Sequence, residues 1–308
     1  MFGGNGVSQG IAKASAGGKT TAPAADRGRR VAFDASSLNK FRDDPRGDEI
    51  LGALHSSGHE PLLSALNVVE MMKWEDVGQR DLLLTRVVEL RGVADLRLLP
   101  LPHEVVEAEF RAWLHNDREI RLGGERVAVC MLALLVHPES RQPAWSEAAR
   151  VYAEAEQRSF VSRLAGITPK LRDLPRRSSS LDAFVHELLN SGEELSAILH
   201  GWFPDLLDNQ ALVRPDEAVG CATHLHTFRT LLVTLGVAAW RHAVLGKPVR
   251  KKKDAGAFDI QQAVYLPLVD LFIVDDGAMR AHLEEVVRLS RVTTELRCYD
   301  ELKGMLAP

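Results

Sequence analysis

The segment Phe258–Asp276, FDIQQAVYLPLVDLFIVDD, carries the pattern that decides the fold. Asp259 opens a segment with helical spacing, and the short apolar run Val269–Val274 follows it and ends in Asp275 and Asp276. In an open parallel sheet, ligands bind beyond the carboxyl ends of the strands, and a helix dipole stabilises an acidic residue in the first turn. We therefore predict that acids from a helix start and a strand end line one crevice.

Two further acids stand in comparable places nearer the start of the chain. The apolar residues Val31–Phe33 predict a short strand that ends in Asp34. The segment Leu62–Met72 has the spacing of a helix, and Glu70 lies beside its apolar face. A single glutamate in such a place is usually a surface residue at the edge of the apolar stripe. Together with the other acids, it becomes a candidate for the same crevice.

Short apolar runs alternate with helical segments through the first part of the chain. A strand is predicted at Leu96–Leu101, and helices are predicted at Glu49–Leu54, Arg80–Leu90 and Val105–Leu114. This alternation is typical of α/β proteins, in which helices cover a sheet of parallel strands. We therefore predict an α/β fold with a central, mostly parallel sheet.

Three segments are predicted to lie outside this regular alternation. Residues 1–30 are rich in Gly, Ala, Ser and Thr, which predicts a disordered tail before a single α/β domain at 31–308. Residues at about 116–213 contain charged amphipathic helices and polar loops, so we interpret them as a large helical insertion in that domain. The apolar segment Asp216–Leu245 predicts one long helix.

Composition narrows the class of protein. The 308 residues include 42 acidic and 38 basic side chains, giving a net charge of -4, so a nucleic acid would have to bind a local basic patch. Cys130, Cys221 and Cys298 are far apart, which predicts reduced thiols, a cytoplasmic location and no structural zinc. No apolar run is long enough to cross a membrane, so we expect no membrane partner.

An acidic crevice of this kind has an electrostatic problem. Carboxylates at close range repel one another unless a divalent cation or a proton lies between them. Hard oxygen ligands suit Mg²⁺ or Mn²⁺, and such ions bind phosphate oxygens and activate water. The alternative is a set of unrelated surface acids, because Asp is common at strand ends and helix starts.

Basic side chains near this segment are candidates for contact with a phosphate backbone. Four consecutive cations stand a few residues before Asp259: Arg250, Lys251, Lys252 and Lys253. Such a run is usually a solvated loop, but beside a carboxylate site it would offset the repulsion of a phosphodiester. His224 and His226 are two residues apart and face different ways on a helix, so they are not expected to share a metal.

Three stretches resemble the PIN domain, a metal-dependent nuclease fold found in toxin ribonucleases and RNA-processing enzymes: VAFDASSL at 31–38, LSALNVVEM at 63–71 and FDIQQAVYLPLVDLFIVDD at 258–276. That family carries Asp after its first strand, Glu in an early helix, Asp opening a late helix and Asp after the following strand. The matching residues are Asp34, Glu70, Asp259 and Asp276. The resemblance covers about 31–114 and 216–306, and it implies a three-layer α/β/α fold.

The resemblance implies a Mg²⁺- or Mn²⁺-dependent endoribonuclease that uses a metal-activated water. Asp34, Asp259 and Asp276 would hold the metal with Asp275 beside them, and Glu70 would bind the metal or its water. Single-stranded RNA is the expected substrate, with Ser36 and the four cations near 250 as its contacts. The family also suggests a homodimer, and the insertion is a candidate surface for a protein partner or inhibitor.

Two departures from the family pattern leave other functions open. Val274 stands where many members carry Thr or Ser, and the insertion at 116–213 is far longer than a minimal member carries. One alternative is a catalytically weak PIN-like module that binds RNA or protein through the insertion. Another is that the insertion is the working part and the α/β core a scaffold. A small phosphotransfer enzyme is disfavoured, because Ser36 stands where a second aspartate would follow Asp34.

Overall fold

The computed structural model of the protein describes residues 28–91, 98–115, 135, 143–171, 178–202, 213–245 and 257–306. Five strands form one sheet in the order β3-β2-β1-β4-β5. Their bounds are Arg29–Phe33 for β1, His59–Ser64 for β2, Leu98–Leu99 for β3, Leu271–Ile273 for β4 and Glu295–Arg297 for β5. All four pairings are parallel, which confirms the predicted α/β fold with a parallel sheet.

The two central strands are buried on both faces. Val31 and Phe33 of β1, and all three residues of β4, are at most 1% exposed. Runs of this kind, without a polar alternate face, are typical of parallel strands covered by helices on both sides. The central part of the hydrophobic core therefore lies around the β1–β4 pair.

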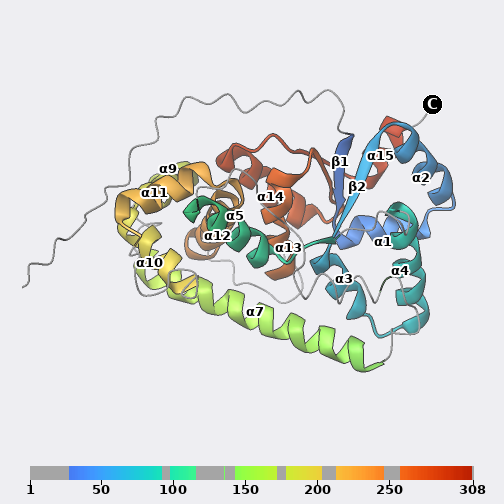
Figure 1. The fold of residues 1–308 in the computed structure, drawn as a ribbon, viewed down its shortest axis with the longest axis horizontal. Coiled ribbons are helices and arrows are strands. Elements are labelled where there is room, and N and C mark those ends of the chain that lie inside the picture. Colours follow the sequence, from blue (N-terminus) through green and yellow to red (C-terminus); the bar gives the residue numbers. More distant parts are fainter. Residues whose placement is uncertain are drawn as a thin grey trace, which may run out of the picture.

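Helices cover both faces of the sheet, giving three layers (Figure 1). On one side, the helices pack against one another and against β2: α1 (Ala35–Asp43), α2 (Gly47–Ser56), α4 (Val77–Arg91) and α15 (Tyr299–Leu306). The other side has α5 (Pro102–Leu114), α12 (His226–Leu245), the 3-10 helix η3 (Ala263–Leu268) and α14 (Gly277–Ser290). The predicted helices at Glu49–Leu54, Arg80–Leu90 and Val105–Leu114 correspond to α2, α4 and α5.

The described part of the predicted insertion is helical. It contains α7 (Pro143–Leu171), α9 (Leu181–Asn190) and α10 (Gly192–Trp202). Helices α9 and α10 pack against α11 (Pro215–His224), and α9 also packs against α12. These two helices therefore extend the layer built on α12 and share its apolar core, which includes Phe184 and Leu188.

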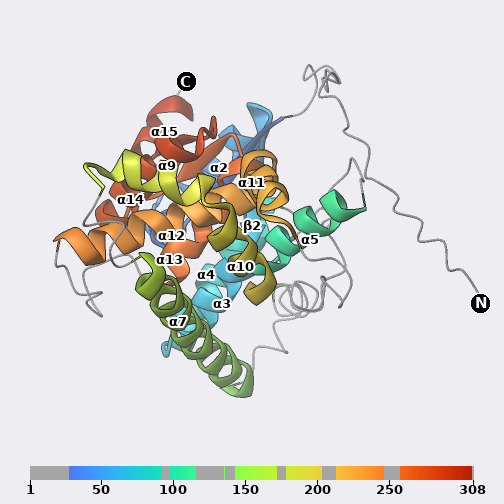
Figure 2. The ribbon, with the colours of Figure 1, turned by 90° about the vertical axis from the view of Figure 1, so that its left-hand side faces the viewer.

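Helix α7 lies across the carboxyl end of the sheet. It packs against α3 (Ala65–Met72), which begins directly after β2, and against α13 (Ala257–Gln262), which precedes η3 and β4. Figure 1 shows α7 running below these two helices, and Figure 2 shows its lower end extending below them. The inward face of α7 includes the small residues Ala149 and Ala153, which are 4% and 5% exposed. Small side chains allow close packing of one helix on another.

The predicted helix Leu62–Met72 was wrong in its first part, because residues 62–64 belong to β2. The boundary is set by Ser64, the N-cap of α3, whose hydroxyl accepts a hydrogen bond from the backbone N–H of Asn67 at 3.0 Å. The Asn67 side chain in turn accepts from the backbone N–H of Ser64 at 3.1 Å. This reciprocal cap satisfies amides that an uncapped helix start would leave without partners.

The predicted single helix Asp216–Leu245 was also wrong, because α11 ends at His224 and α12 begins at His226. Glu109, which lies on α5 and is 5% exposed, reaches the start of α12. Its carboxylate accepts backbone hydrogen bonds from His226 and Thr227, both at 2.9 Å, and from Phe228 at 3.2 Å. A buried anion at a helix N-terminus is stabilised by the free N–H groups and the helix dipole, so it favours a new helix start at this point.

We expect Glu109→Ala to lower the free energy of unfolding by about 3 kcal/mol, because charge-assisted hydrogen bonds are lost and buried amides lose their acceptor. Urea unfolding followed by circular dichroism measures this. Glu107→Ala is the matched control, since Glu107 lies on the same helix in a surface ion pair with Arg111 and should cost less than about 1 kcal/mol. Equal losses in the two variants would contradict a capping role for Glu109.

Some predicted features lie outside the described residues. They include the tail up to residue 27, residues 116–134 at the start of the insertion, and the four cations at 250–253. The strand predicted at Leu96–Leu101 lies outside the description at residues 96 and 97; it ends earlier than predicted, because β3 spans Leu98–Leu99 and Leu101 is the N-cap of α5. Among the helices that the structure describes, none is both long and apolar enough to span a membrane.

Candidate functional site

The strand order places a topological switch point between β1 and β4. From β1 the chain builds β2 and β3 on one side, whereas β4 and β5 lie on the other. In open α/β sheets, ligands bind outside the carboxyl ends of the strands at such a point. Asp34 follows β1 and the pair Asp275 and Asp276 closely follows β4, so the fold brings these predicted acids to one edge.

Asp34 is a buried carboxylate, only 2% exposed, at the N-cap of α1. It accepts hydrogen bonds from the Ser36 hydroxyl at 2.5 Å and from the backbone N–H of Ser37 at 2.7 Å. Burial, with a smaller contribution from the negative charge of Asp275, raises the pKa of Asp34 to about 6, although the hydrogen bonds from Ser36 and Ser37 lower it. The site therefore holds an acid whose charged form is destabilised by its surroundings.

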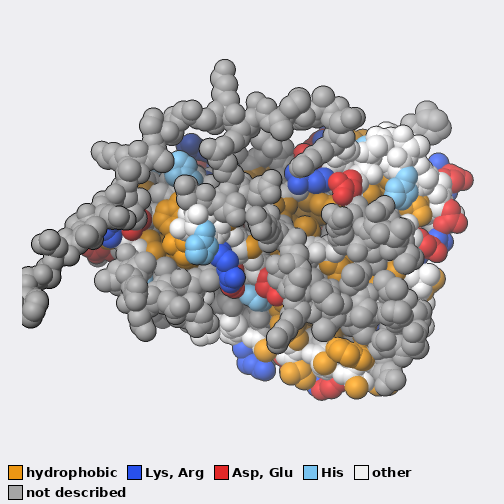
Figure 3. Space-filling view, viewed as in Figure 1, with side chains coloured by type: hydrophobic (Ala, Val, Ile, Leu, Met, Phe, Trp, Pro, Cys, Tyr) orange, Lys and Arg blue, Asp and Glu red, His pale blue; other side chains and the backbone are white. Residues whose placement is uncertain are grey.

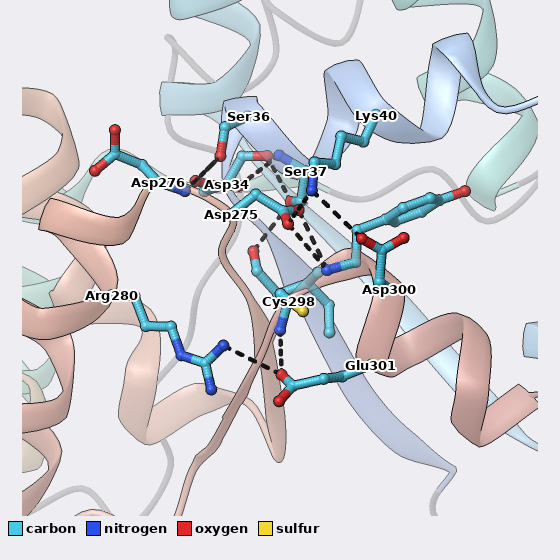
Figure 4. Close-up of polar contacts among 12 residues, drawn as sticks. Asp34, Ser36, Ser37, Lys40, Asp275, Asp276, Arg280, Cys298, Asp300 and Glu301 are labelled. Atoms are coloured by element: carbon cyan, nitrogen blue, oxygen red, sulfur yellow. Dashed lines mark hydrogen bonds and ion pairs between the residues drawn. The ribbon is translucent and has the colours of Figure 1, made fainter.

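Ser36 connects Asp34 with Asp276. Its hydroxyl donates to Asp34 and accepts from the backbone N–H of Asp276 at 3.1 Å. Ser36 was predicted to bind substrate, but its hydroxyl proton is already donated to Asp34 within the site. Asp276 itself is exposed and caps α14, where its carboxylate accepts from the backbone N–H of Met279 at 2.8 Å. Figure 4 shows the Asp276 carboxylate pointing away from Asp34.

Asp275 has partners of its own on the other side of this edge. Its side chain is 5% exposed and forms an ion pair with Lys40 of α1, at 2.7 Å. Its carboxylate also accepts from the backbone N–H of Tyr299, the first residue of α15, at 3.2 Å. Figure 4 shows Lys40 reaching toward Asp275. Its contacts thus tie α1 and α15 to the end of β4, beside the predicted metal ligands.

Glu70, on α3, faces the helix that carries Asp259. The Gln262 side chain, on α13, donates to the Glu70 carboxylate at 3.0 Å. One turn before Glu70, the Asn67 side chain donates to the backbone carbonyl of Phe33 at 3.1 Å, next to Asp34. Helix α3 is therefore attached both to the end of β1 and to α13. Asp259 lies in α13 one turn before Gln262, and its side chain lies outside the description.

The chemistry of the predicted ligands suits a hard divalent cation. The predicted ligands are carboxylates, and Asp34 is a buried acid whose described hydrogen-bond donors, Ser36 and Ser37, are uncharged. A cation beside it would favour the charged form that burial disfavours. Within the described ranges, no three His, Cys, Asp or Glu side chains are grouped closely enough to hold a metal ion. The carboxylates of Asp34 and Asp276 would have to turn toward each other to bind one.

Other predicted candidates are placed less centrally. His224 and His226 are exposed and lie on either side of the break between α11 and α12, in keeping with surface histidines. Cys221 is buried and Cys298 is half-buried, and both are free thiols. Val274, at the position where the PIN family often has a hydroxyl, is fully buried in the core.

Three residues at this edge were missed by sequence reasoning: Lys40, Asn67 and Gln262. Asn67 and Gln262 each lie three residues from a predicted acid, which in a helix is one turn along the same face. That spacing was an available signal. Nothing in the local sequence around Lys40 indicates its pairing with Asp275, because the two residues are 235 positions apart.

Comparison with known proteins adds no assignment. No protein-family model matches the chain, and no curated protein or solved structure matches it significantly. A proposal of function therefore rests on the geometry at this edge and on the resemblance of its residues to the PIN domain.

We expect Asp34→Asn to stabilise the metal-free protein at pH 7 by about 3 kcal/mol, since the pKa of Asp34 is about 6 in the folded state and each pKa unit of difference from an unfolded carboxyl is worth about 1.4 kcal/mol. The Asp34 carboxyl therefore binds its proton more tightly in the folded state than in the unfolded chain. The stability that this protonation contributes to the wild type is fully present below pH 4 and is lost as the pH rises through 6. The difference between variant and wild type should therefore vanish at low pH.

Urea unfolding between pH 4 and 8, in EDTA, measures this difference. Asp300→Asn is the control, because the Asp300 side chain lies at the same edge and is 73% exposed. Its effect on stability should change by less than about 1 kcal/mol over this range. A destabilised Asp34→Asn protein at pH 7 would show that the buried charge is favourable in the absence of metal.

Proposed function

We propose that the protein is a PIN-type ribonuclease that depends on Mg²⁺ or Mn²⁺. The observation that carries this proposal is the placement of Asp34 and Asp276 at the switch point of a parallel sheet, where both contact Ser36, which lies 240 positions before Asp276. The three-layer arrangement and the positions of Glu70 on α3 and Asp259 on α13 support it. All four acids named by the resemblance lie on elements that meet at the carboxyl end of the sheet.

The proposed chemistry assigns a role to each acid. Asp34, Asp259 and Asp276 would hold the divalent ion. When bound, the ion would supply a water of lowered pKa and stabilise charge on the phosphate oxygens. Glu70 would orient that water or complete the ligand set. Asp275 has a different role in this proposal, because its ion pair with Lys40 and its contact with α15 hold the end of β4 in place.

Access to the site favours a flexible substrate. Asp34 is 2% exposed, and α7 crosses the carboxyl end of the sheet against α3 and α13. A duplex is stiff and wide, whereas a single strand can enter a narrow site with its bases unstacked. We therefore propose single-stranded RNA as the substrate and infer that α7, packed against the helices of Glu70 and Asp259, restricts its access to the site. A homodimer and the basic contacts at 250–253 remain predictions.

One observation favours a second candidate, a module that binds RNA or protein and has little catalytic activity. The packing of α7, a helix of the insertion, against α3 and α13 would suit a protein whose working surface is the outer face of α7. That face carries Trp145 and Val151, which are 42% and 48% exposed, beside ion pairs such as Arg150 with Glu154. Figure 3 shows hydrophobic and charged side chains mixed along this lower edge of the molecule.

A cleavage assay separates these two functions. With Mn²⁺ and a mixed pool of single-stranded RNA, we expect cutting by the wild type, no cutting in EDTA, and a loss of roughly a hundredfold or more in Asp34→Asn and Asp276→Asn. Asp300→Asn, at the exposed margin of the same edge, should retain activity. Full activity of the two site variants would exclude the nuclease reading, and binding of RNA without cutting would support the second candidate.

The position of α7 leads to a separate expectation. Ala149→Glu places a charge on the buried face of α7 and should loosen its contact with α3 and α13. We expect faster amide hydrogen exchange in α3 and faster RNA cleavage. Val151→Glu, two residues along on the exposed face, is the control and should leave both rates unchanged. Slower cleavage together with faster exchange would mean that α7 contributes to substrate binding instead of restricting access.

A further inference from the structure

Gln262 is a buried polar residue whose side chain contacts a predicted site acid. It is the last residue of α13 and is 1% exposed. Its side-chain amide donates to Oε2 of Glu70 at 3.0 Å, across 192 positions of sequence. Burying an amide costs free energy unless it forms hydrogen bonds, so this contact is a specific feature of the junction between α3 and α13.

The contact restricts the orientation of Glu70. Helix α3 is attached at its start, where Asn67 donates to the carbonyl of Phe33. One turn later, the bond from Gln262 holds one carboxylate oxygen of Glu70. This bond restricts the orientations that the Glu70 carboxylate can take relative to α13. A flexible glutamate thereby has fewer orientations open to it at the carboxyl end of the sheet.

We propose that Gln262 is a positioning residue that orients Glu70 toward the metal ion and its water. This inference rests on the proposed metal-dependent nuclease function. Groups that hydrogen-bond to metal ligands commonly affect metal affinity by orienting those ligands. Gln262 lies on the helix that carries Asp259, so the same contact also links the two helices that contribute these acids.

The chemistry of an amide suits this position. A glutamate in place of Gln262 would add a negative charge beside Glu70, where acids already accumulate. A lysine would form an ion pair with Glu70 and compete with the metal for it. An amide donates a hydrogen bond and adds no net charge, so Gln262 itself does not neutralise Glu70.

The test compares Gln262→Leu with Gln261→Leu. Gln261 is the neighbouring residue, has the same side chain and is 6% exposed, so both variants remove a buried amide from α13. Mn²⁺ binding is measured by titration calorimetry, and thermal unfolding in EDTA reports the structural cost of each change. We expect Mn²⁺ to bind about tenfold more weakly to Gln262→Leu and within about twofold of wild type to Gln261→Leu.

A third variant keeps the hypothesis testable if Gln262→Leu does not fold. Gln262→Glu keeps the size of the side chain, and the repulsion that it adds beside Glu70 is relieved when a cation binds nearby. We expect its thermal midpoint to rise more on addition of Mn²⁺ than that of the wild type. In cleavage assays, Gln262→Leu should lower kcat with little change in KM, because the proposed role concerns the metal-bound water and leaves RNA binding intact.

Three outcomes overturn the inference, and they are distinguishable. If wild type and Gln262→Leu bind Mn²⁺ equally and cleave at the same rate, the nuclease proposal stands and Gln262 is only a structural contact between helices. If the wild type binds no Mn²⁺ and Asp34→Asn changes nothing, the proposed function fails, and the positioning role fails with it. Equal loss of Mn²⁺ affinity in the Gln261 and Gln262 variants would also overturn it, as a general effect of disturbing α13.

Discussion

The parallel pairing of β1 with β4 is the constraint on which the rest of the site depends. The backbone N–H of Asp34 donates to the carbonyl of Ile273 at 2.9 Å, and the Ser37 hydroxyl donates to the same carbonyl at 3.0 Å. Ser36 adds the bond to Asp276. These contacts join two segments that are far apart in sequence, at the carboxyl ends of adjacent strands. Without this pairing, the acids would belong to separate surfaces.

The same pairing explains why the site is electrostatically costly. Because β1 is central and covered on both faces, the carboxylate that follows it is also buried, and its pKa rises to about 6. Ser36 and Ser37 offset part of the cost by donating to it. The charge of Asp34 therefore does not stabilise the folded protein. Groups at functional sites often lower stability in this way.

Contacts between helices that are remote from the acids help to position the helices of the site. Glu109 starts α12 from α5, and α12 packs against α13, α14 and η3, so a buried anion remote from the acids helps to place the helix that carries Asp259. Long insertions cost little additional loop entropy when their ends are close. The segment between α5 and α11 is therefore tolerated, and its helix α7 comes to lie across the edge at which the acids gather.

Much of this organisation was predictable from sequence, because it depends on local patterns. Short apolar runs that end in Asp predicted β1 and β4, and helical spacing predicted α2, α4 and α5 to within a few residues. The errors were at boundaries set by contacts. Leu62–Ser64 formed a strand because β1 and β3 pair with it, and α11 was separated from α12 where Glu109, 117 positions away, capped a new helix.

The sequence by itself determined the fold class and which acids could meet, since apolar periodicity and strand-end positions are properties of neighbouring residues. Only the tertiary structure decided how those acids are surrounded. It buried Asp34, paired Asp275 with Lys40, turned Asp276 toward the start of α14 and set Gln262 against Glu70. Each of these depends on contacts between residues that are distant in the chain, and local patterns carry no information about which distant partner a side chain will meet.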